Sequence, residues 1–445
     1  MGIYKECDIR GVYNQELDEN TAYDIGRAIG AKMSGKSLVV AGDVRVSTNS
    51  LKSVLIDGLY RSGANIIDIG MAPTPVLYFA KNFYRADGGI AVTASHNPPQ
   101  YNGFKFILGQ WPVTPEDIEE IKGLVGRKQF INGEGSLKKI DASEDYRKFI
   151  KTLTKKYQKL KVVIDAGNGA TSVLAPRIFR ELGYEVVELF CEFDGSFPNR
   201  SPNPAVYGHL KTLQEIVVAE KADLGAAFDG DGDRVVFVDD KGNVSTSEES
   251  FTLFIKEYLK EAPGPVVYDI KSSSIVEREI KKHHSRPIME RSGHAFIKRT
   301  LLESGAVLAG EISGHFFFRE LGGDDGIYAA VKMAEILGKN GISLSEHAGA
   351  VAKTIITPDI RVPCASEMQE VLLTKIAGMG ERYPVSRLDG VRVGFPKGWL
   401  LVRKSVTEPC VTVRIEAEGR NEMDGILNVL YEYAPELKGK HEFLK

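Results

Sequence analysis

A hydroxyl, an imidazole and an ammonium group lie within one short stretch of the chain, on Ser95, His96 and Lys105. The apolar run at 88–92 comes just before them and predicts a buried strand. Asn97 and the two prolines after it predict a turn, so these side chains should lie on a loop at the end of a strand. A serine on such a loop can carry a transferable group, because a covalent intermediate divides one difficult step into two. A lone Ser-His pair is more often a turn beside a surface histidine, so the rest of the chain must decide.

A second signal is an acidic cluster in which glycines separate Asp229, Asp231 and Asp233. The glycines allow the backbone to curl so that the three carboxylates converge. Hard oxygen donors of this kind suit Mg²⁺ or Ca²⁺, and without a cation they would repel one another. An EF-hand is excluded, because its sixth position needs glycine and its twelfth needs glutamate, whereas this chain has Arg234 and Asp240 there. The cluster therefore predicts a metal site of another kind.

Two further polar turns could bind a phosphorylated sugar. Glu311 and Ser313 are two residues apart, so in an extended loop both can face one pair of vicinal hydroxyls. Arg403, Ser405 and Thr407 place a cation and two hydroxyls in one turn that can hold a phosphate through charge-assisted hydrogen bonds. Taken alone, the first turn would be a helix cap or a surface charge, and the second an exposed basic turn.

These stretches resemble the α-D-phosphohexomutase family, and they occur in the family's order along the chain. The matching segments are T-A-S-H-N-P at 93–98, N-G-F-K at 102–105, D-G-D-G-D-R at 229–234, G-E-I-S-G-H at 310–315 and R-K-S-V-T-E-P at 403–409. The resemblance implies that Ser95 is phosphorylated in the resting enzyme. It also implies that the three aspartates hold Mg²⁺, with a phosphoserine oxygen of Ser95 as a further ligand.

Shorter matches extend the set of expected site residues. D-I-R-G at 8–11, D-I-K-S-S at 269–273 and R-S-G-H at 291–294 resemble family segments. The resemblance implies a catalytic set and a substrate-binding set. The catalytic set is Ser95, His96, Lys105, Arg10 and Arg234; the substrate-binding set is Lys271, His294, Glu311, Ser313, His315, Arg403, Ser405 and Thr407.

The chain departs from the family pattern at several places. Cys7 stands where tyrosine is usual, Ile312 replaces methionine, and Val406 replaces asparagine or glycine in the phosphate turn. Gly42 replaces the first arginine of a G-R-D-x-R segment, so we interpret residues 41–45 as structural.

The elements that must position these residues alternate between strand and helix. Apolar runs at 38–41, 65–69, 161–165 and 265–270 predict strands, and residues 51–62 predict a helix. A length of 445 residues suggests about three domains. The resemblance implies four, at 1–152, 153–252, 253–357 and 358–445. They should form three similar mixed α/β domains and a smaller C-terminal α+β domain around a central cleft.

Composition excludes several classes of protein. The net charge of −3 gives no basic surplus for nucleic acid or an anionic membrane. The four cysteines are scattered, which argues against a disulfide framework and fits a reducing compartment. No apolar run approaches the ~18 residues of a membrane span, and the N-terminus does not resemble a signal peptide. We therefore expect a cytoplasmic protein. Separately, we expect a monomer or homodimer, although composition does not determine the oligomeric state.

The resemblance predicts an enzyme that interconverts hexose 1-phosphate and hexose 6-phosphate through a hexose 1,6-bisphosphate. The best match is the phosphomannomutase/phosphoglucomutase branch, since the phosphoglucosamine mutase branch typically has glutamine where this chain has Ile312. The resemblance implies that Glu311 and Ser313 bind O3 and O4 of the hexose, so that C2 is not recognised and both glucose and mannose are accepted. Phosphoglucosamine mutase and an Mg²⁺-dependent sugar phosphatase are the alternatives, and a sugar-phosphate sensor without catalysis is a third. Lys105, His96 and His294 are unranked candidates for proton transfer.

Overall fold

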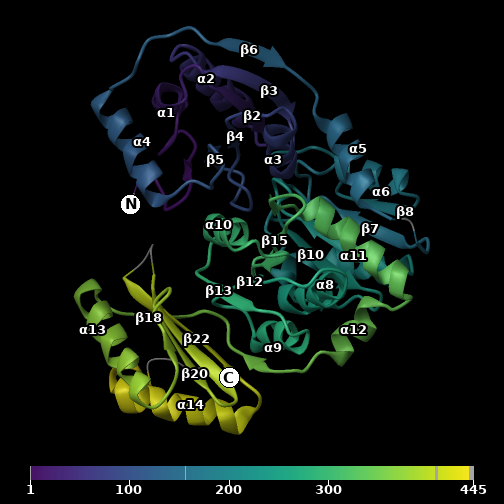
Figure 1. Cartoon of the computed structure of the whole chain (residues 1–445), viewed down its shortest axis with the longest axis vertical. Coiled ribbons are helices and arrows are strands. Elements are labelled where there is room, and N and C mark those ends of the chain that lie inside the picture. Colours follow the sequence, from purple (N-terminus) through teal and green to yellow (C-terminus); the bar gives the residue numbers. More distant parts are fainter. Residues whose placement is uncertain (1, 156, 406–408, 440–445) are drawn as a thin grey trace.

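The structure is a computed structural model that describes residues 2–155, 157–405 and 409–439, and four β-sheets follow one another along it (Figure 1). We call the segments that carry them modules 1, 2 and 3 and the C-terminal module. Module 1 contains β1 (Ile9–Val12), α1 (Glu19–Lys32), β2 (Ser37–Gly42), α2 (Thr48–Tyr60), β3 (Asn65–Met71), α3 (Thr74–Phe83), β4 (Gly88–Val92), β5 (Tyr101–Leu108), α4 (Pro115–Arg127), β6 (Ser136–Lys139) and α5 (Ser143–Leu153).

Modules 2 and 3 are shorter. Module 2 contains β7 (Lys161–Asp165), α6 (Leu174–Glu181), β8 (Glu185–Leu189), α7 (Lys211–Ala219), β9 (Leu224–Phe228), β10 (Val235–Asp239), β11 (Val244–Ser245) and α8 (Ser247–Glu261). Module 3 contains β12 (Val266–Asp269), α9 (Ser274–Lys282), β13 (Pro287–Glu290), α10 (His294–Ser304), β14 (Leu308–Gly310), β15 (Phe316–Phe318), β16 (Gly323–Asp324), α11 (Gly326–Asn340) and α12 (Leu344–Ala350).

The three modules repeat one strand topology. In module 1, β2 pairs in parallel with both β3 and β4, and β4 then pairs antiparallel with β5. Module 2 repeats this pattern with β7 between β8 and β9, and β9 antiparallel to β10. Module 3 repeats it with β12 between β13 and β14, and β14 antiparallel to β15. The prediction of three similar mixed α/β modules is confirmed.

The repeat explains how distant motifs come together. The connections at 93–100, 229–234 and 311–315 follow β4, β9 and β14, and each joins that strand to its antiparallel neighbour, so they occupy equivalent positions. Direct backbone contacts link them: Arg234 forms a β-bridge with His315, and Thr74 N, at the start of α3, donates to Asp231 O at 2.9 Å. Three motifs that are far apart in the sequence thus meet at one place.

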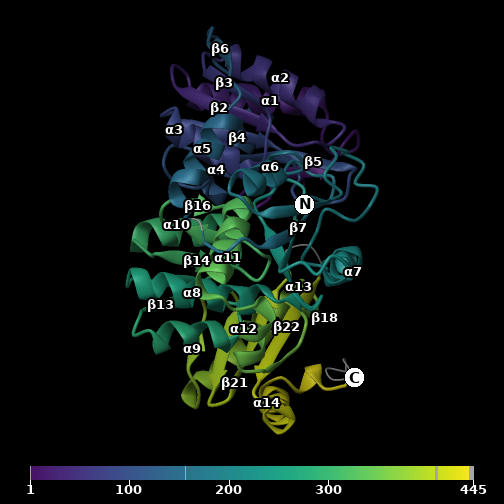
Figure 2. The ribbon, with the colours of Figure 1, turned by 90° about the vertical axis from the view of Figure 1, so that its right-hand side faces the viewer.

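Modules 1 to 3 share a hydrophobic core. One buried cluster includes Val39 of β2, Ile164 of β7, Phe254 of α8, Phe316 of β15 and Ile327 of α11. Burial of large apolar side chains of this kind contributes roughly 1.5–3 kcal/mol each. The three modules are therefore held together by the same interaction that stabilises each of them, and Figure 2 shows module 1 at the top with modules 2 and 3 below it.

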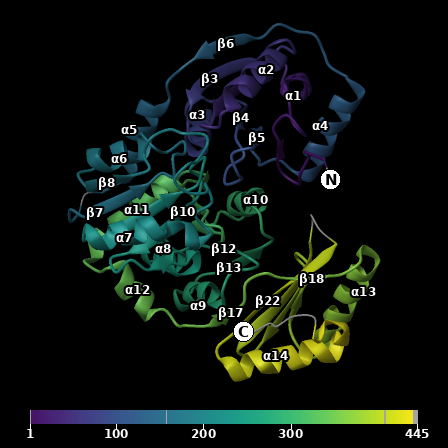
Figure 3. The same cartoon turned by 180° about the vertical axis from the view of Figure 1, so that it is seen from behind.

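The C-terminal module has a sheet and a core of its own. Its elements are β17 (Ile355–Ile356), β18 (Ile360–Pro363), α13 (Ser366–Ala377), β19 (Val385–Ser386), β20 (Val391–Phe395), β21 (Gly398–Lys404), β22 (Cys410–Ala417) and α14 (Arg420–Tyr433). The strands pair antiparallel, and Figure 3 shows α13 and α14 on one side of the sheet. This module is the expected α+β unit.

Polar contacts attach the C-terminal module to module 3. The fully buried carboxylate of Glu416 accepts hydrogen bonds from Ser273 Oγ at 2.7 Å and from Ser274 N at 2.8 Å, at the start of α9. Lys271 Nζ lies 2.6 Å from Asp359 Oδ2. No helix among the described residues is both long enough and apolar enough to cross a membrane.

A buried carboxylate at the start of α11 makes stability depend on pH. Asp325 accepts from Tyr328 N at 2.8 Å and from Tyr146 Oη at 2.7 Å, and burial raises the pKa of Asp325 to about 7. Because the folded state binds the proton more tightly than the unfolded state, this carboxyl group stabilises the fold at low pH. That contribution is lost as pH rises from about 4 towards 7. We expect the urea midpoint of Asp325→Asn to fall less than that of the wild type between pH 5 and pH 8.

Asp18→Asn is the matched control for this measurement. Asp18 also caps a helix, but hydrogen bonds from Thr21 hold the pKa of its carboxyl below the ordinary value. It stays ionised throughout the range, so its variant should follow the wild-type pH dependence. Equal pH dependence of Asp325→Asn and wild type would contradict the prediction.

Candidate active site

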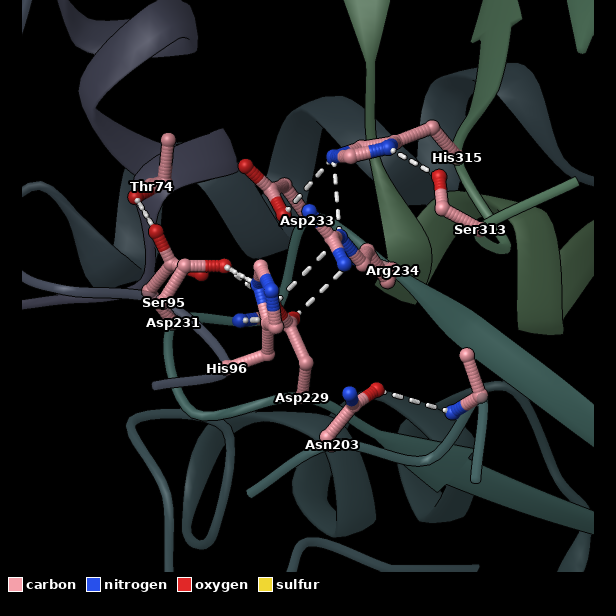
Figure 4. A network of polar contacts seen from close by, with 12 residues as sticks. Thr74, Ser95, His96, Asn203, Asp229, Asp231, Asp233, Arg234, Ser313 and His315 are labelled. Atoms are coloured by element: carbon pink, nitrogen blue, oxygen red, sulfur yellow. Dashed lines mark hydrogen bonds and ion pairs between the residues drawn. The ribbon is translucent and has the colours of Figure 1, made fainter. Parts of the chain in front are cut away.

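Ser95 lies where the three equivalent loops meet (Figure 4). Its side chain is fully buried, and its Oγ donates to Asp229 Oδ2 at 2.7 Å and lies 3.3 Å from His96 Nδ1. Its φ of 50° is in the left-handed region, which costs a residue with a side chain free energy. The surrounding contacts must therefore hold the serine in this conformation, with its hydroxyl against the acidic cluster.

Arg45 supplies most of that support. Its guanidinium donates to the carbonyl oxygens of Ser95 at 2.8 Å and Asn97 at 2.6 Å, and Asp43 pairs with its Nε at 3.0 Å. The interpretation of residues 41–45 as structural understated this role. The carbonyl oxygens of the serine loop that Arg45 contacts lie about 50 residues further along the chain, so no local pattern reveals them, and the partial match to the family segment was the available signal.

The acidic turn fits closely against the serine loop because of its glycines. A Cβ on Gly230 would come within 2.5 Å of Ser95 O, and Gly232 has a φ of 79°. Asp229, Asp231 and Asp233 each place one carboxylate oxygen within 4.8 Å of the others, and all three are buried. The turn therefore holds three carboxylates beside one hydroxyl.

The electrostatics of this cluster call for a cation. Burial and the two neighbouring carboxylates raise the pKa of Asp229 to about 8. Burial also opposes ionisation of Asp231 and Asp233, but Lys105 holds the pKa of both below the ordinary value. Lys105 Nζ contacts Asp231 Oδ2 at 2.8 Å and Asp233 Oδ2 at 2.5 Å. Asp229 has only a distant cation beside it among the described residues, Arg234 Nε at 3.9 Å, so a further cation close to the three carboxylates would stabilise their ionised form.

The donor set fits a hard divalent cation. Asp231 Oδ1 is buried and accepts no hydrogen bond from any described residue, and Asp233 Oδ1 has one ion-pair contact, with His315 Nε2 at 3.2 Å. Unpaired buried carboxylate oxygens are costly, and oxygen ligands are what Mg²⁺ and Ca²⁺ prefer. These aspartates are thus a possible metal-binding group, as the sequence predicted.

The loop at 311–315 forms a network around His315. The imidazole Nδ1 lies 2.9 Å from Glu311 Oε2 and 2.9 Å from Ser313 Oγ, and Nε2 lies 3.2 Å from Asp233 Oδ1. Burial and Arg234 disfavour the charged ring, but Asp233 and Glu311 outweigh them and raise the pKa of His315 to about 9. Burial would raise the pKa of Glu311, but His315 lowers it to about 2. The pair is therefore an imidazolium and a carboxylate at neutral pH.

The three candidates for proton transfer differ in the charge that each side chain carries at neutral pH. Burial would lower the pKa of Lys105, but Asp231 and Asp233 raise it, so this side chain stays an ammonium. The charge of Arg234, burial and the charge of Arg10 hold the pKa of His96 well below its ordinary value. Burial lowers the pKa of His294 to about 4. Both imidazoles are neutral at physiological pH and can accept a proton.

Two arginines surround the serine loop. Arg10 donates to Asn97 Oδ1 at 2.7 Å, on the residue two positions after Ser95. Arg234 Nε lies 3.9 Å from Asp229 Oδ2 and 3.3 Å from His315 Nε2. Both cations therefore lie at the meeting point of the three loops, where sequence reasoning placed them.

The remaining predicted residues lie apart from this centre. Lys271 pairs with Asp359, and Arg403 pairs with Asp389 at 2.6 Å within the C-terminal module. Ser405 N donates to Cys410 O at 2.9 Å, and Thr407 lies outside the described residues. The structure thus places Arg403 near the end of β21 and Ser405 directly after this strand, both on a separate module.

Sequence reasoning missed Asp324. This residue is 1% exposed, and neither of its carboxylate oxygens accepts a hydrogen bond from a described residue. Oδ2 lies 3.8 Å from His315 Nε2, and Oδ1 lies 3.9 Å from Lys298 Nζ. The Asp-Asp-Gly sequence at 324–326 resembles an ordinary turn with a helix cap, which is the role that Asp325 performs.

Comparison with known proteins gives a consistent result along the whole chain. Four family descriptions match: "Phosphoglucomutase/phosphomannomutase, alpha/beta/alpha domain I" at residues 2–132, domain II at 143–242, domain III at 246–355, and the C-terminal domain at 360–432. The chain is 40% identical over 437 residues to the phosphomannomutase/phosphoglucomutase of Pseudomonas aeruginosa, covering 96% of this chain and 94% of that protein.

Other relatives agree. The chain is 37% identical over 441 residues to a phosphoglucomutase of Neisseria meningitidis, covering 96% of this chain and 95% of the relative. The crystal structure of a phosphoglucomutase/phosphomannomutase family protein from Burkholderia thailandensis superposes with a TM-score of 0.92 at 35% identity, and covers 99% of both chains.

Proposed function

The chain belongs to the phosphoglucomutase/phosphomannomutase family, and from this premise we propose how its residues perform the reaction. The protein is a phosphohexomutase that interconverts hexose 1-phosphate and hexose 6-phosphate. In our proposal, phosphorylated Ser95 gives its phosphoryl group to the free hydroxyl of the sugar. The resulting 1,6-bisphosphate turns around, and its other phosphoryl group returns to Ser95.

One observation carries this proposal: Ser95 Oγ is 2.7 Å from the carboxylate of Asp229, within a cluster of three aspartates that needs a cation. We assign Asp229, Asp231 and Asp233, with the phosphorylated Ser95, as the ligands of Mg²⁺. When bound, the ion would neutralise charge on the phosphoryl group as it is transferred. Arg10 and Arg234 would add positive charge on either side of the same group.

The sugar-binding residues must serve both orientations of the intermediate. We propose that Glu311 and Ser313 bind O3 and O4, while Arg403, Ser405 and Thr407 hold the phosphate that is not reacting. His315, charged and bonded to Glu311, fixes the position of that carboxylate. Lys271 would approach the substrate from module 3 once its contact with Asp359 opens. Because C2 is not read, both glucose and mannose phosphates should be substrates.

Proton transfer must balance each half-reaction. One P–O bond breaks at Ser95 and one forms at the sugar, so the proton that the sugar hydroxyl loses is matched by the proton that Ser95 Oγ gains. We propose His294 as the acceptor for the sugar proton, because its imidazole is neutral and its Nδ1 has no hydrogen-bond partner among the described residues. His96 lies on the serine side of the transfer.

Side-by-side rates on mannose, glucose and glucosamine 1-phosphates, with inorganic phosphate measured in the same reactions, test the proposal. We expect turnover of the first two sugars at the highest rates and no accumulation of inorganic phosphate. Preference for the amino sugar would instead indicate a phosphoglucosamine mutase, and release of phosphate to water would indicate a phosphatase. We retain the domain boundaries at 1–152, 153–252, 253–357 and 358–445, a cytoplasmic location and a monomer or homodimer as proposals.

The proposed phosphate clamp gives a prediction about substrate affinity. Arg403→Met removes the guanidinium, and we expect KM for hexose 1-phosphate to rise roughly 10²-fold with a smaller change in kcat, because a charge-assisted contact to the distal phosphate is lost. Arg387→Met, at an exposed arginine of the same module, is the control and should leave KM unchanged. An unchanged KM in Arg403→Met would show that the phosphate is held elsewhere.

A further inference from the structure

A cavity of about 420 Å³ lies between module 1 and module 3, outside the site described above. Its module 1 wall is the C-terminal half of α3 and the residues that follow, including Lys81 and Arg85. Its module 3 wall is α10 and the turn after β15, including Lys298 and Leu321. The two helices lie on the same side of the molecule in Figure 2. A volume of this size is typical of pockets that bind small molecules.

Three cations line this cavity without acceptors for their protons. In the described part of the chain, the side chains of Lys81, Arg85 and Lys298 donate no hydrogen bond to another residue. Lys298 is only 5% exposed, and its Nζ has two contacts: it lies 3.6 Å from the ring centroid of Tyr78 and 3.9 Å from Asp324 Oδ1. A buried ammonium group usually donates hydrogen bonds, so the side chain of Lys298 lacks the acceptors that such a group normally has.

The balance of charge at the cavity is positive. Asp87 is the acidic residue of its lining, and its Oδ2 already accepts from Ser37 N at 2.9 Å and Ser37 Oγ at 3.1 Å. Asn82 and Gln110 add neutral amide donors at the rim. Burial lowers the pKa of both Lys81 and Lys298, which indicates that their charges are incompletely compensated. An anion entering the cavity would supply the missing acceptors.

We propose that this cavity is a second anion-binding site, which takes a small phosphate or phosphate ester on Lys81, Arg85 and Lys298. The site is separate from the phosphate clamp at Arg403. Its position gives it a consequence for the reaction centre. Helix α3 begins at Thr74, whose Oγ1 donates to Asp231 Oδ2 at 2.7 Å, and α10 begins at His294. A bound anion would therefore tie together two helices that both start at the active site.

The test uses the full chain with Mg²⁺ in the Arg403→Met background, where the distal phosphate clamp has been removed. Inorganic phosphate and glycerol phosphate are titrated at constant ionic strength set with chloride, and binding is followed by calorimetry and by the thermal unfolding midpoint. We expect both ligands to bind and to raise the midpoint. The ligand that binds with the lower Kd shows whether the cavity prefers free phosphate or a phosphate ester.

Adding Lys81→Gln and Arg85→Gln should weaken this binding roughly tenfold or more, because two of the three charges are lost. These side chains are at the surface end of the cavity, so folding should be retained. Lys122→Gln with Arg127→Gln removes the same charge from α4 and is the matched control, which should not change binding. Lys298→Met should abolish phosphate binding if this variant folds. If it does not fold, the Lys81→Gln, Arg85→Gln variant tests the proposed site on its own.

Unchanged phosphate binding in the Lys81→Gln, Arg85→Gln chain would overturn the proposal, and so would equal weakening by the α4 control. In the otherwise wild-type chain, the Lys81→Gln, Arg85→Gln substitutions should leave mutase turnover without added anion unchanged, since neither residue lies in the reaction centre. The outcome is thus independent of the proposed phosphoserine mechanism.

Discussion

Ser95→Ala should abolish turnover while the fold is retained. The substitution removes the oxygen that would carry the phosphoryl group, so no remaining step can replace it, and kcat should fall by at least roughly 10⁴-fold. The lost contacts are the hydrogen bonds of Ser95 Oγ with Asp229 and His96, and the backbone of the loop is held by Arg45 through carbonyl oxygens that the substitution does not change. We expect an unfolding midpoint near that of the wild type, measured with steady-state rates on the same preparation.

Ser172→Ala is the matched control. Ser172 is also a buried serine in a turn, but its Oγ donates to Gly169 O at 2.7 Å and not to a carboxylate of the acidic cluster. Its variant should lose some stability and keep full activity. Substantial turnover in Ser95→Ala would remove the covalent mechanism, whatever the control shows.

Asp231→Asn should have the second largest effect. The variant loses one of three carboxylates that we assign to Mg²⁺, so the affinity for the metal should fall and kcat should drop on the order of 10²–10³-fold at fixed Mg²⁺. Without metal, the variant should be less stable than the wild type, because the ionised carboxylate of Asp231 pairs with Lys105 and its pKa lies below the ordinary value, so its charge stabilises the fold. Metal titration by calorimetry and unfolding in the presence of chelator measure the two effects separately.

Asp239→Asn provides the comparison for this prediction. Asp239 is a buried aspartate at the end of the strand that follows the acidic turn, and its Oδ1 accepts from Lys241 N and Asn243 N. An amide oxygen can accept the same bonds, so metal affinity and kcat should stay close to wild-type values. Full activity of Asp231→Asn at low Mg²⁺ would contradict the assignment of this carboxylate to the metal.

Local sequence carried enough information to predict the three loops and their strands. Residues 88–92 and 161–165 form strands over the ranges that their apolar runs indicated, and the helix predicted at 51–62 runs from Thr48 to Tyr60. The glycines of the acidic turn predicted the convergence of its carboxylates. In each case the property is local, because it depends on side chains within a few residues of one another.

Other features depend on contacts that no local pattern records. Arg45 reaches the Ser95 loop over 50 residues of sequence, and Asp324 meets His315 and Lys298 only after β15 and β16 have paired. The equivalence of the three loops follows from the order of the strands in each sheet. Sequence comparison between the modules does not reveal it, because the modules share topology more than residue identity. Long-range geometry of this kind is set by packing, and for that reason the cavity at Lys298 had no sequence signal.

The most direct test of the account is to locate the phosphoryl group. The dephosphorylated enzyme is incubated with glucose 1,6-bisphosphate and Mg²⁺, digested, and analysed by peptide-resolved mass spectrometry, with released sugars and inorganic phosphate measured in parallel. We predict one phosphoryl group on Ser95, formed together with glucose 1-phosphate and glucose 6-phosphate and lost again when either monophosphate is added in excess. A chain that stays unmodified at Ser95 while it interconverts the two monophosphates would contradict the central claim.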